Sequence, residues 1–172
     1  MVQCGVSGTE VDEKLQGTVI TAEPPRTIGQ ATVDPKGRLK LPSQFLDFLR
    51  KLGVVKVYMT TVDMRSARLY PISEWLHNEN LLATQSELSE EAEEVAYLAK
   101  FYGDDSPIDE QGRVLVPQEL RRKLGLEGKP VYLDWYKGRI NVAGKEIHDE
   151  RLTRAEINLA EKVKKLEKVG LR

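Results

Sequence analysis

The chain of 172 residues contains one nine-residue pattern twice. Residues 34–42 read DPKGRLKLP, and residues 109–117 read DEQGRVLVP. In each copy an aspartate, with a glycine three positions later, suits a type I turn that ends in a left-handed residue, as in a three-residue hairpin loop. The alternating strand that follows ends at a proline, which favours the first turn of a helix. The pattern therefore predicts a hairpin and then a short helix, formed twice.

Both expected helices end in the letters KLG, at residues 51–53 and 123–125. Glycine is the usual residue just beyond the end of a helix, and the β-rich stretches that follow predict a further hairpin. A unit of about 45 residues buries too little surface to fold alone, so we expect the two copies to share one core. We expect five segments: a flexible N-terminal arm over 1–25, a first repeat over 26–76, a helical acidic connector over 77–103, a second repeat over 104–150 and a C-terminal amphipathic helix over 151–172.

The charged residues are unevenly distributed, although the net charge is only –1. Residues 26–70 carry nine Lys and Arg against three acids, and residues 113–172 carry fifteen against nine. The stretch between them, residues 71–112, carries one lysine against eleven acids. Each basic block includes one copy of the pattern or begins within it. The distribution is compatible with a nucleic-acid partner and equally with ordinary solvated surface.

Several classes of protein are disfavoured. The chain has no apolar run approaching the roughly 20 residues of a transmembrane helix, and its first residues lack the features of a secretory signal. Its single cysteine, Cys4, cannot form an internal disulfide. We therefore expect a cytoplasmic protein with no membrane partner.

We expect no catalytic residues, metal or cofactor. The two histidines, His77 and His148, stand in unrelated contexts, and no phosphate-binding or dinucleotide-binding glycine pattern occurs. One acidic group could bind a divalent cation, but it lacks the spacing of a calcium loop and is better interpreted as part of an acidic connector. That group consists of Asp104, Asp105, Asp109 and Glu110.

The repeated pattern resembles the AbrB-like DNA-binding unit, and two copies in one chain resemble the MraZ family of bacterial transcriptional regulators. Residues 69–71 (LYP), Glu74-Trp75 and residues 99–103 (AKFYG) match the family as well. The resemblance implies an α+β fold, in which two swapped-hairpin repeats form a small β-barrel with helices packed outside. It also implies a homo-oligomer, expected to be a closed ring, that binds repeated operator sites controlling division and cell-wall genes. The protein would then be nucleoid-associated.

In the resembling family the turns face double-stranded DNA. An arginine such as Arg38 can donate two hydrogen bonds to guanine or grip a phosphate, a lysine such as Lys36 suits a phosphate, and Gln111 can pair with adenine. Alternatively, each arginine simply pairs with the aspartate of its own turn and holds it closed. The candidate DNA-binding residues are Lys36, Arg38, Lys40, Gln111 and Arg113, and the turn-forming residues are Asp34, Gly37, Asp109 and Gly112.

A different function remains open on the same sequence. The acidic block and the C-terminal segment could serve a protein-interaction or assembly module, such as an antitoxin-like partner, with no direct DNA readout. The two functions differ in salt dependence, because phosphate contacts make DNA affinity fall steeply as salt rises.

Overall fold

The computed structural model describes residues 22–172. The arm expected over residues 1–25 thus lies outside the described residues, apart from its last four positions. Within the described part of the chain, eight strands and six helices follow in the order β1 (Gly29–Thr32), β2 (Arg38–Lys40), α1 (Ser43–Lys51), β3 (Lys56–Thr60), β4 (Ala67–Pro71), α2 (Ile72–Thr84), α3 (Ser89–Tyr102), β5 (Asp104–Pro107), β6 (Arg113–Leu115), α4 (Gln118–Leu124), β7 (Pro130–Tyr136), β8 (Arg139–Gly144), α5 (Lys145–Glu156) and α6 (Leu159–Glu167).

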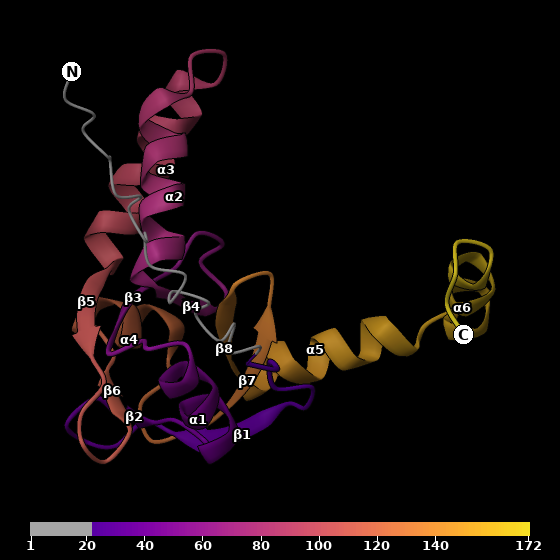
Figure 1. Ribbon diagram of the computed structural model, residues 1–172, viewed down its shortest axis with the longest axis horizontal. Coiled ribbons are helices and arrows are strands. Elements are labelled where there is room, and N and C mark those ends of the chain that lie inside the picture. The colour runs from indigo at the N-terminus through magenta and orange to yellow at the C-terminus, as the bar shows by residue number, and fades with distance from the viewer. Residues whose placement is uncertain (1–21) are drawn as a thin grey trace, which may run out of the picture.

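The strands form two antiparallel sheets (Figure 1). Six strands pair in the order β1-β7-β8-β4-β3-β5, and the short strands β2 and β6 pair with each other. The hairpins β3–β4 and β7–β8 each form within one copy of the repeat, whereas β1 pairs with β7 and β5 pairs with β3. Each copy therefore contributes its first strand to the hairpin of the other. The expected α+β class is confirmed.

The closed barrel implied by the resemblance is not confirmed. Among the described strands, β1 and β5 are the two edges of the larger sheet and do not pair with each other. After each edge strand the chain reverses in a tight turn, and the next strands, β2 and β6, pair with each other instead. Pro42 and Pro117 follow closely and have no N–H to donate, so this ladder stops after three residue pairs.

The main core is a cluster to which both copies contribute, and a smaller buried cluster is formed by Tyr70, Trp75 and Ala99. Leu39 and Leu41 are fully buried, whereas Lys40 between them is exposed, as the alternation of a strand with one wet face requires. Helices α1 and α4 each bury an apolar side chain in the same cluster, Phe45 and Leu120. Burial of these faces is the main source of stability, because apolar surface removed from water contributes roughly 25 cal/mol per Å².

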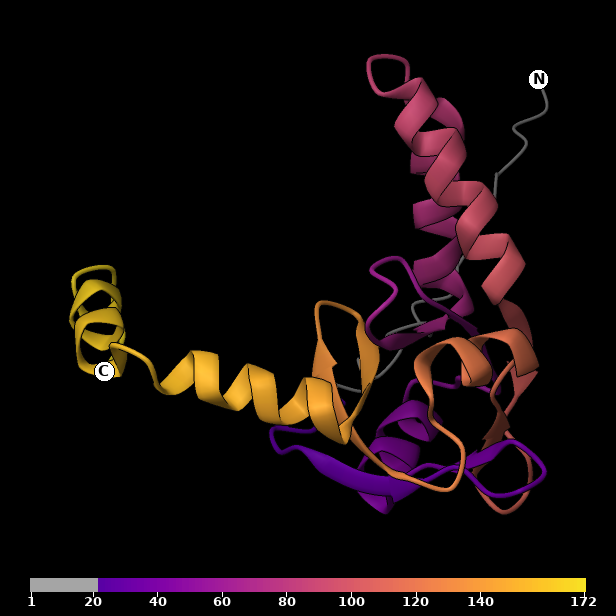
Figure 2. The same ribbon diagram turned by 180° about the vertical axis from the view of Figure 1, so that it is seen from behind.

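Helices α2 and α3 form a hairpin that projects from the sheets (Figures 1 and 2). Its base is fixed by Trp75, which stacks on Tyr58 with ring centroids 4.4 Å apart. The Thr60 hydroxyl donates to the carbonyl oxygen of Ala99 over 2.7 Å. Helices α2 and α3 cover most of residues 77–103, the stretch where a helical acidic connector is expected.

The single C-terminal helix expected over residues 151–172 is a wrong prediction. Helix α5 already begins at Lys145 and ends at Glu156, and α6 is a separate helix from Leu159. Between them Asn158 has φ +55°, a left-handed conformation that asparagine tolerates better than most residues. The sequence predicts one helix because apolar residues recur at helical spacing on both sides of the break. Neither α5 nor α6 has a buried residue, so no packing keeps the two helices collinear.

Candidate nucleic-acid interface

The first turn, residues 34–38, is closed by its aspartate. Asp34 Oδ1 accepts hydrogen bonds from the backbone N–H groups of Lys36 and Arg38, each over 2.9 Å. The Gly37 N–H donates to the Asp34 carbonyl oxygen over 2.8 Å, and Gly37 has φ +82°, which glycine adopts without steric cost. The backbone and side-chain hydrogen bonds from Arg38 to the Asp34 carboxylate lower the pKa of Asp34. The turn thus holds a carboxylate in its charged form.

The second turn, residues 109–113, repeats this geometry. Asp109 Oδ1 accepts from the N–H groups of Gln111 and Arg113, over 2.9 and 2.8 Å. The Gly112 N–H donates to the Asp109 carbonyl oxygen over 2.9 Å. Hydrogen bonding from the Arg113 N–H, followed by the Arg113 side chain, lowers the pKa of Asp109. Two segments of different sequence therefore fold into the same turn, and the turns predicted at these four aspartate and glycine positions are present.

Both turn arginines pair with the aspartate of their own turn. Arg38 Nε donates to Asp34 Oδ2 over 2.8 Å, and Arg113 Nε donates to Asp109 Oδ2 over the same distance. The pairing considered from the sequence is therefore real. This pairing uses only part of each guanidinium group, which has five N–H donors. The Arg38 and Arg113 side chains remain 31% and 24% exposed, so each can donate outward while its aspartate fixes its orientation.

The turns lie side by side at one corner of the molecule, on the lower left in Figure 1 and the lower right in Figure 2. The pairing of β2 with β6 brings them together. The Leu41 N–H donates to the Gly112 carbonyl oxygen over 2.9 Å, and the Val116 N–H donates to the Gly37 carbonyl oxygen over 2.8 Å. Each turn is thus anchored by the strand that follows the other turn.

The remaining candidate residues at this corner point to solvent. Lys36, Lys40 and Gln111 are exposed, and neither lysine forms an ion pair with another residue of the described region. With Asp34 and Arg38 offsetting each other, the two lysines leave the first turn and its strand with a charge of +2. The second turn has Glu110 beside its arginine–aspartate pair, and its charge is –1. The corner is therefore electrostatically asymmetric.

Two residues that the sequence analysis missed support the turns from beneath. An added Cβ at Gly37 would lie 1.4 Å from Arg121 Nη1, so the Arg121 guanidinium packs directly against this glycine. Arg121 is held there by hydrogen bonds to the Val116 carbonyl oxygen and to Glu127, over 3.0 and 3.1 Å. Leu46 occupies the equivalent place beneath Gly112.

A sequence comparison of the two helices could have found this pair. Leu46 stands four positions after Pro42, and Arg121 stands four positions after Pro117. The equivalence shows that each helix supports the turn of the other copy. Exchange between the copies thus involves the helices as well as the strands.

Other polar residues considered from the sequence do not gather into a site. Asp105 pairs with Lys56 over 2.6 Å, and Asp109 belongs to the second turn. The His148 ring stacks on Tyr132, with centroids 3.8 Å apart. In residues 22–172, no group of three or more His, Cys, Asp or Glu side chains is placed to hold a metal ion. No helix in this region has the length and apolar character needed to cross a bilayer.

Comparison with known proteins identifies the family. The chain is 34% identical over 98 residues to "Transcriptional regulator MraZ" of Koribacter versatilis, a match that covers 56% of this chain and 67% of the relative. It is 34% identical over 99 residues to the protein of that name from Acidobacterium capsulatum, covering 58% and 68%. The same name belongs to a relative from Halorhodospira halophila, 34% identical over 110 residues and covering 63% and 72%. No model of a known protein family matches the chain.

These relatives define a class, transcriptional regulators, and within it one family. The chain belongs to the MraZ family.

Proposed function

We propose that this protein regulates transcription by binding repeated operator sites in double-stranded DNA as a homo-oligomer, with the two turns as the DNA-contacting elements. The observation that carries the proposal is the pair of equivalent turns at one corner, each presenting an arginine oriented by an aspartate. The exchange of strands between the copies supports an AbrB-like swapped-hairpin unit. The protein acts in the cytoplasm at the nucleoid, with division and cell-wall genes as its targets.

The dimensions of the corner suit the major groove. Paired strands are about 4.8 Å apart, so a two-stranded ribbon such as β2–β6 fits a groove about 12 Å wide. Arg38 and Arg113 are fixed by their aspartates before DNA arrives, so little side-chain entropy is lost on binding. The N–H groups that remain on each guanidinium can reach guanine O6 and N7. Exposed Gln111 offers one donor and one acceptor to adenine.

The charge at the corner argues for several subunits. Beyond the two paired arginines and Arg121, which pairs with Glu127, the two turns and their strands contribute Lys36 and Lys40 as cations, and Glu110 opposes them. A single subunit thus neutralises few phosphates, and phosphate neutralisation supplies most of the affinity of a non-specific complex. Linking several subunits in a ring raises the apparent affinity for tandem sites through effective concentration.

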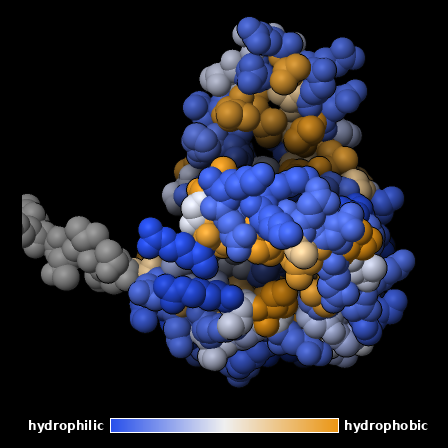
Figure 3. Space-filling model, turned by 90° about the vertical axis from the view of Figure 1, so that its right-hand side faces the viewer, coloured by the Kyte–Doolittle hydropathy of each residue, from blue (hydrophilic) through white to orange (hydrophobic). Residues whose placement is uncertain are grey.

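A surface suited to self-association is present on the α2–α3 hairpin. Leu76 of α2 and Tyr97 and Phe101 of α3 are 57%, 75% and 58% exposed. On the face of the molecule shown in Figure 3, hydrophobic residues gather on this projecting part. Exposed apolar patches of this kind mark contacts with other chains. We assign this surface to the homo-oligomer.

Substitution of the first turn arginine tests the proposal. Arg38→Ala removes a base contact, so we expect operator affinity to fall by about 5- to 150-fold per engaged turn. Its effect on the melting temperature should be small, because a partly exposed ion pair stabilises a protein little. Lys36→Ala should weaken binding to every sequence alike and reduce the salt slope by about one unit. Lys165→Ala, which removes a cation and an exposed ion pair on α6, is the matched control.

Two results would contradict the proposal. In the first, Arg38→Ala lowers the melting temperature while the folded protein keeps its operator affinity. Arg38 would then only close its own turn and would not contact DNA. Alternatively, the unmodified protein could fail to bind heparin or duplex DNA at low salt. That second result would favour the protein-interaction module.

A further inference from the structure

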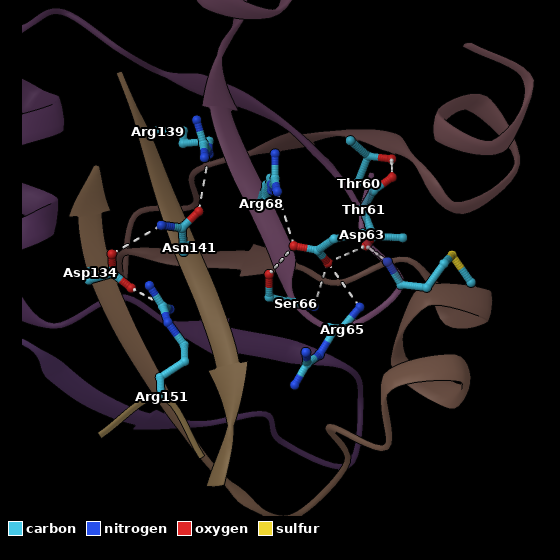
Figure 4. A network of polar contacts seen from close by, with 11 residues as sticks. Thr60, Thr61, Asp63, Arg65, Ser66, Arg68, Asp134, Arg139, Asn141 and Arg151 are labelled. Carbon is cyan, nitrogen blue, oxygen red and sulfur yellow. Dashed lines mark hydrogen bonds and ion pairs between the residues drawn. The ribbon is translucent and has the colours of Figure 1, made fainter. Parts of the chain in front are cut away.

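A second group of cations lies outside the two turns, around a cavity of about 240 Å³. The cavity lies between the loop that joins β3 to β4, strand β8 and helix α5, and part of its lining is shown in Figure 4. It shares no residue with the first or second turn. Five arginines line it: Arg65, Arg68, Arg139, Arg151 and Arg154. We call it the arginine cavity.

The carboxylates around the arginine cavity do not balance its cations. Arg68 pairs with Asp63 over 3.0 Å, and Arg151 pairs with Asp134 over 3.3 Å. A single carboxylate, Glu150, serves both Arg65 and Arg154. Five positive charges thus face three negative charges, which leaves an excess of two.

Unused N–H donors lie on two residues of adjacent strands, Arg68 of β4 and Arg139 of β8. Arg139 Nε donates to the amide oxygen of Asn141 over 3.1 Å, and within residues 22–172 Arg139 pairs with no carboxylate. Arg68 Nε is the one buried side-chain nitrogen or oxygen of the described region that lacks a hydrogen-bond partner. An unsatisfied buried donor is costly, and this one belongs to a side chain that lines the cavity. Both arginines therefore have donor capacity beyond their present partners.

The Asp63 carboxylate does not satisfy the remaining N–H donors of Arg68 and Arg139. Its Oδ1 accepts from the N–H groups of Arg65 and Ser66, and its Oδ2 accepts from the Ser66 hydroxyl and the Arg68 guanidinium. Burial alone would raise the pKa of Asp63, but the N–H groups of Ser66 and Arg65 and the Arg68 side chain together lower it to about 2. The carboxylate is thus fully used in shaping the loop.

We propose that the arginine cavity binds a small anion that carries a phosphate group, with Arg68 and Arg139 as its principal ligands. A dianionic phosphate matches the excess of two positive charges. Its tetrahedral oxygens also match the planar fork of arginine, which binds phosphate through paired N–H groups. The cavity is smaller than the roughly 300–1,000 Å³ of pockets for drug-sized ligands, so inorganic phosphate or a small phosphate monoester is the fitting class.

The test measures phosphate binding to the full-length protein by calorimetry. Inorganic phosphate and glycerol phosphate are titrated in parallel, in a buffer whose ionic strength is held constant with sodium chloride. Saturable binding of one anion per chain is the expected result. Binding of inorganic phosphate alone would identify a free anion as the ligand, and binding of both would identify an ester-tolerant site. Absence of saturable binding by either would overturn the proposal.

Substitutions then locate the bound anion. Arg139→Gln should weaken binding by about tenfold or more, since it removes a charged donor. Arg139→Lys should keep part of the phosphate affinity, because lysine still supplies a positive charge although it lacks the planar fork of arginine. Lys165→Ala on α6, which lies outside both the arginine cavity and the two turns, is the matched control and should leave phosphate binding unchanged. Unchanged phosphate affinity in Arg139→Gln would overturn the assignment.

Hydrogen exchange on the unmodified protein keeps the proposal testable if the variants fail to fold. Saturating phosphate should slow amide exchange in residues 63–68 and 139–154, because a ligand stabilises the segments that hold it. The turn peptides 34–40 and 109–115 should be unaffected. Protection confined to those turns, or an adventitious ion that protects no segment, would refute the site.

Discussion

The support of the first turn by Arg121 leads to a prediction about Gly37→Ala. A methyl group at this position would lie 1.4 Å from Arg121 Nη1 and must displace the guanidinium. The residue would also stand at φ +82°, where a side chain costs about 1–2 kcal/mol. Displacement breaks the charged hydrogen bond from Arg121 to the Val116 carbonyl oxygen, and such a bond contributes about 1.5–3 kcal/mol. We expect the free energy of unfolding to fall by about 3 kcal/mol.

Gly53→Ala is the matched control for the backbone cost. Gly53 has a similar φ of +71°, but nothing lies within 4 Å of an added Cβ. Its substitution should therefore cost only about 1–2 kcal/mol, the left-handed conformation alone. Urea unfolding of both variants measures the two costs, and an unchanged slope against urea shows that the denatured state is the same.

A double-mutant cycle sharpens this test. Arg121→Ala removes the group with which the new methyl collides, so it should cost less in the Gly37→Ala background than in the unmodified protein. Equal costs for Gly37→Ala and Gly53→Ala, within about 0.5 kcal/mol, would refute the reasoning. So would simple additivity of Gly37→Ala and Arg121→Ala.

Two further predictions concern the rest of the molecule. Asp63 has a pKa of about 2 in the folded protein, below its ordinary 3.8, so its stabilising contribution is complete above pH 3.8 and is lost as pH falls toward 2. Asp63→Asn should lower the free energy of unfolding at neutral pH by about 1–2 kcal/mol and flatten its dependence on pH between 4 and 2; an unchanged acid profile in urea unfolding would contradict this. Asn158→Ala disfavours φ +55°, so α5 and α6 should join and helical circular dichroism should rise, whereas an unchanged spectrum would show that other contacts hold the break.

The sequence by itself determined the features that local interactions form. The hydrogen bonds that close the first turn join Asp34 to residues no more than four positions away, so they depend on the local sequence. The same holds for the short helices after Pro42 and Pro117, which begin and end where proline and glycine predict. The alternation that buries Leu39 and exposes Lys40 follows from the two-residue period of a strand.

The tertiary structure decided which distant segments meet. The pairing of β2 with β6 and the packing of Arg121 against Gly37 join residues that are far apart in the chain. The arginine cavity likewise combines Arg68 with Arg139 from strands in different copies. Such contacts depend on how the whole core closes, because the cost of bringing distant segments together is recovered only when many apolar side chains are buried at once. The break at Asn158 was missed for the opposite reason: no burial holds α5 and α6 in line, so the local conformation of one residue overrides a continuous apolar pattern.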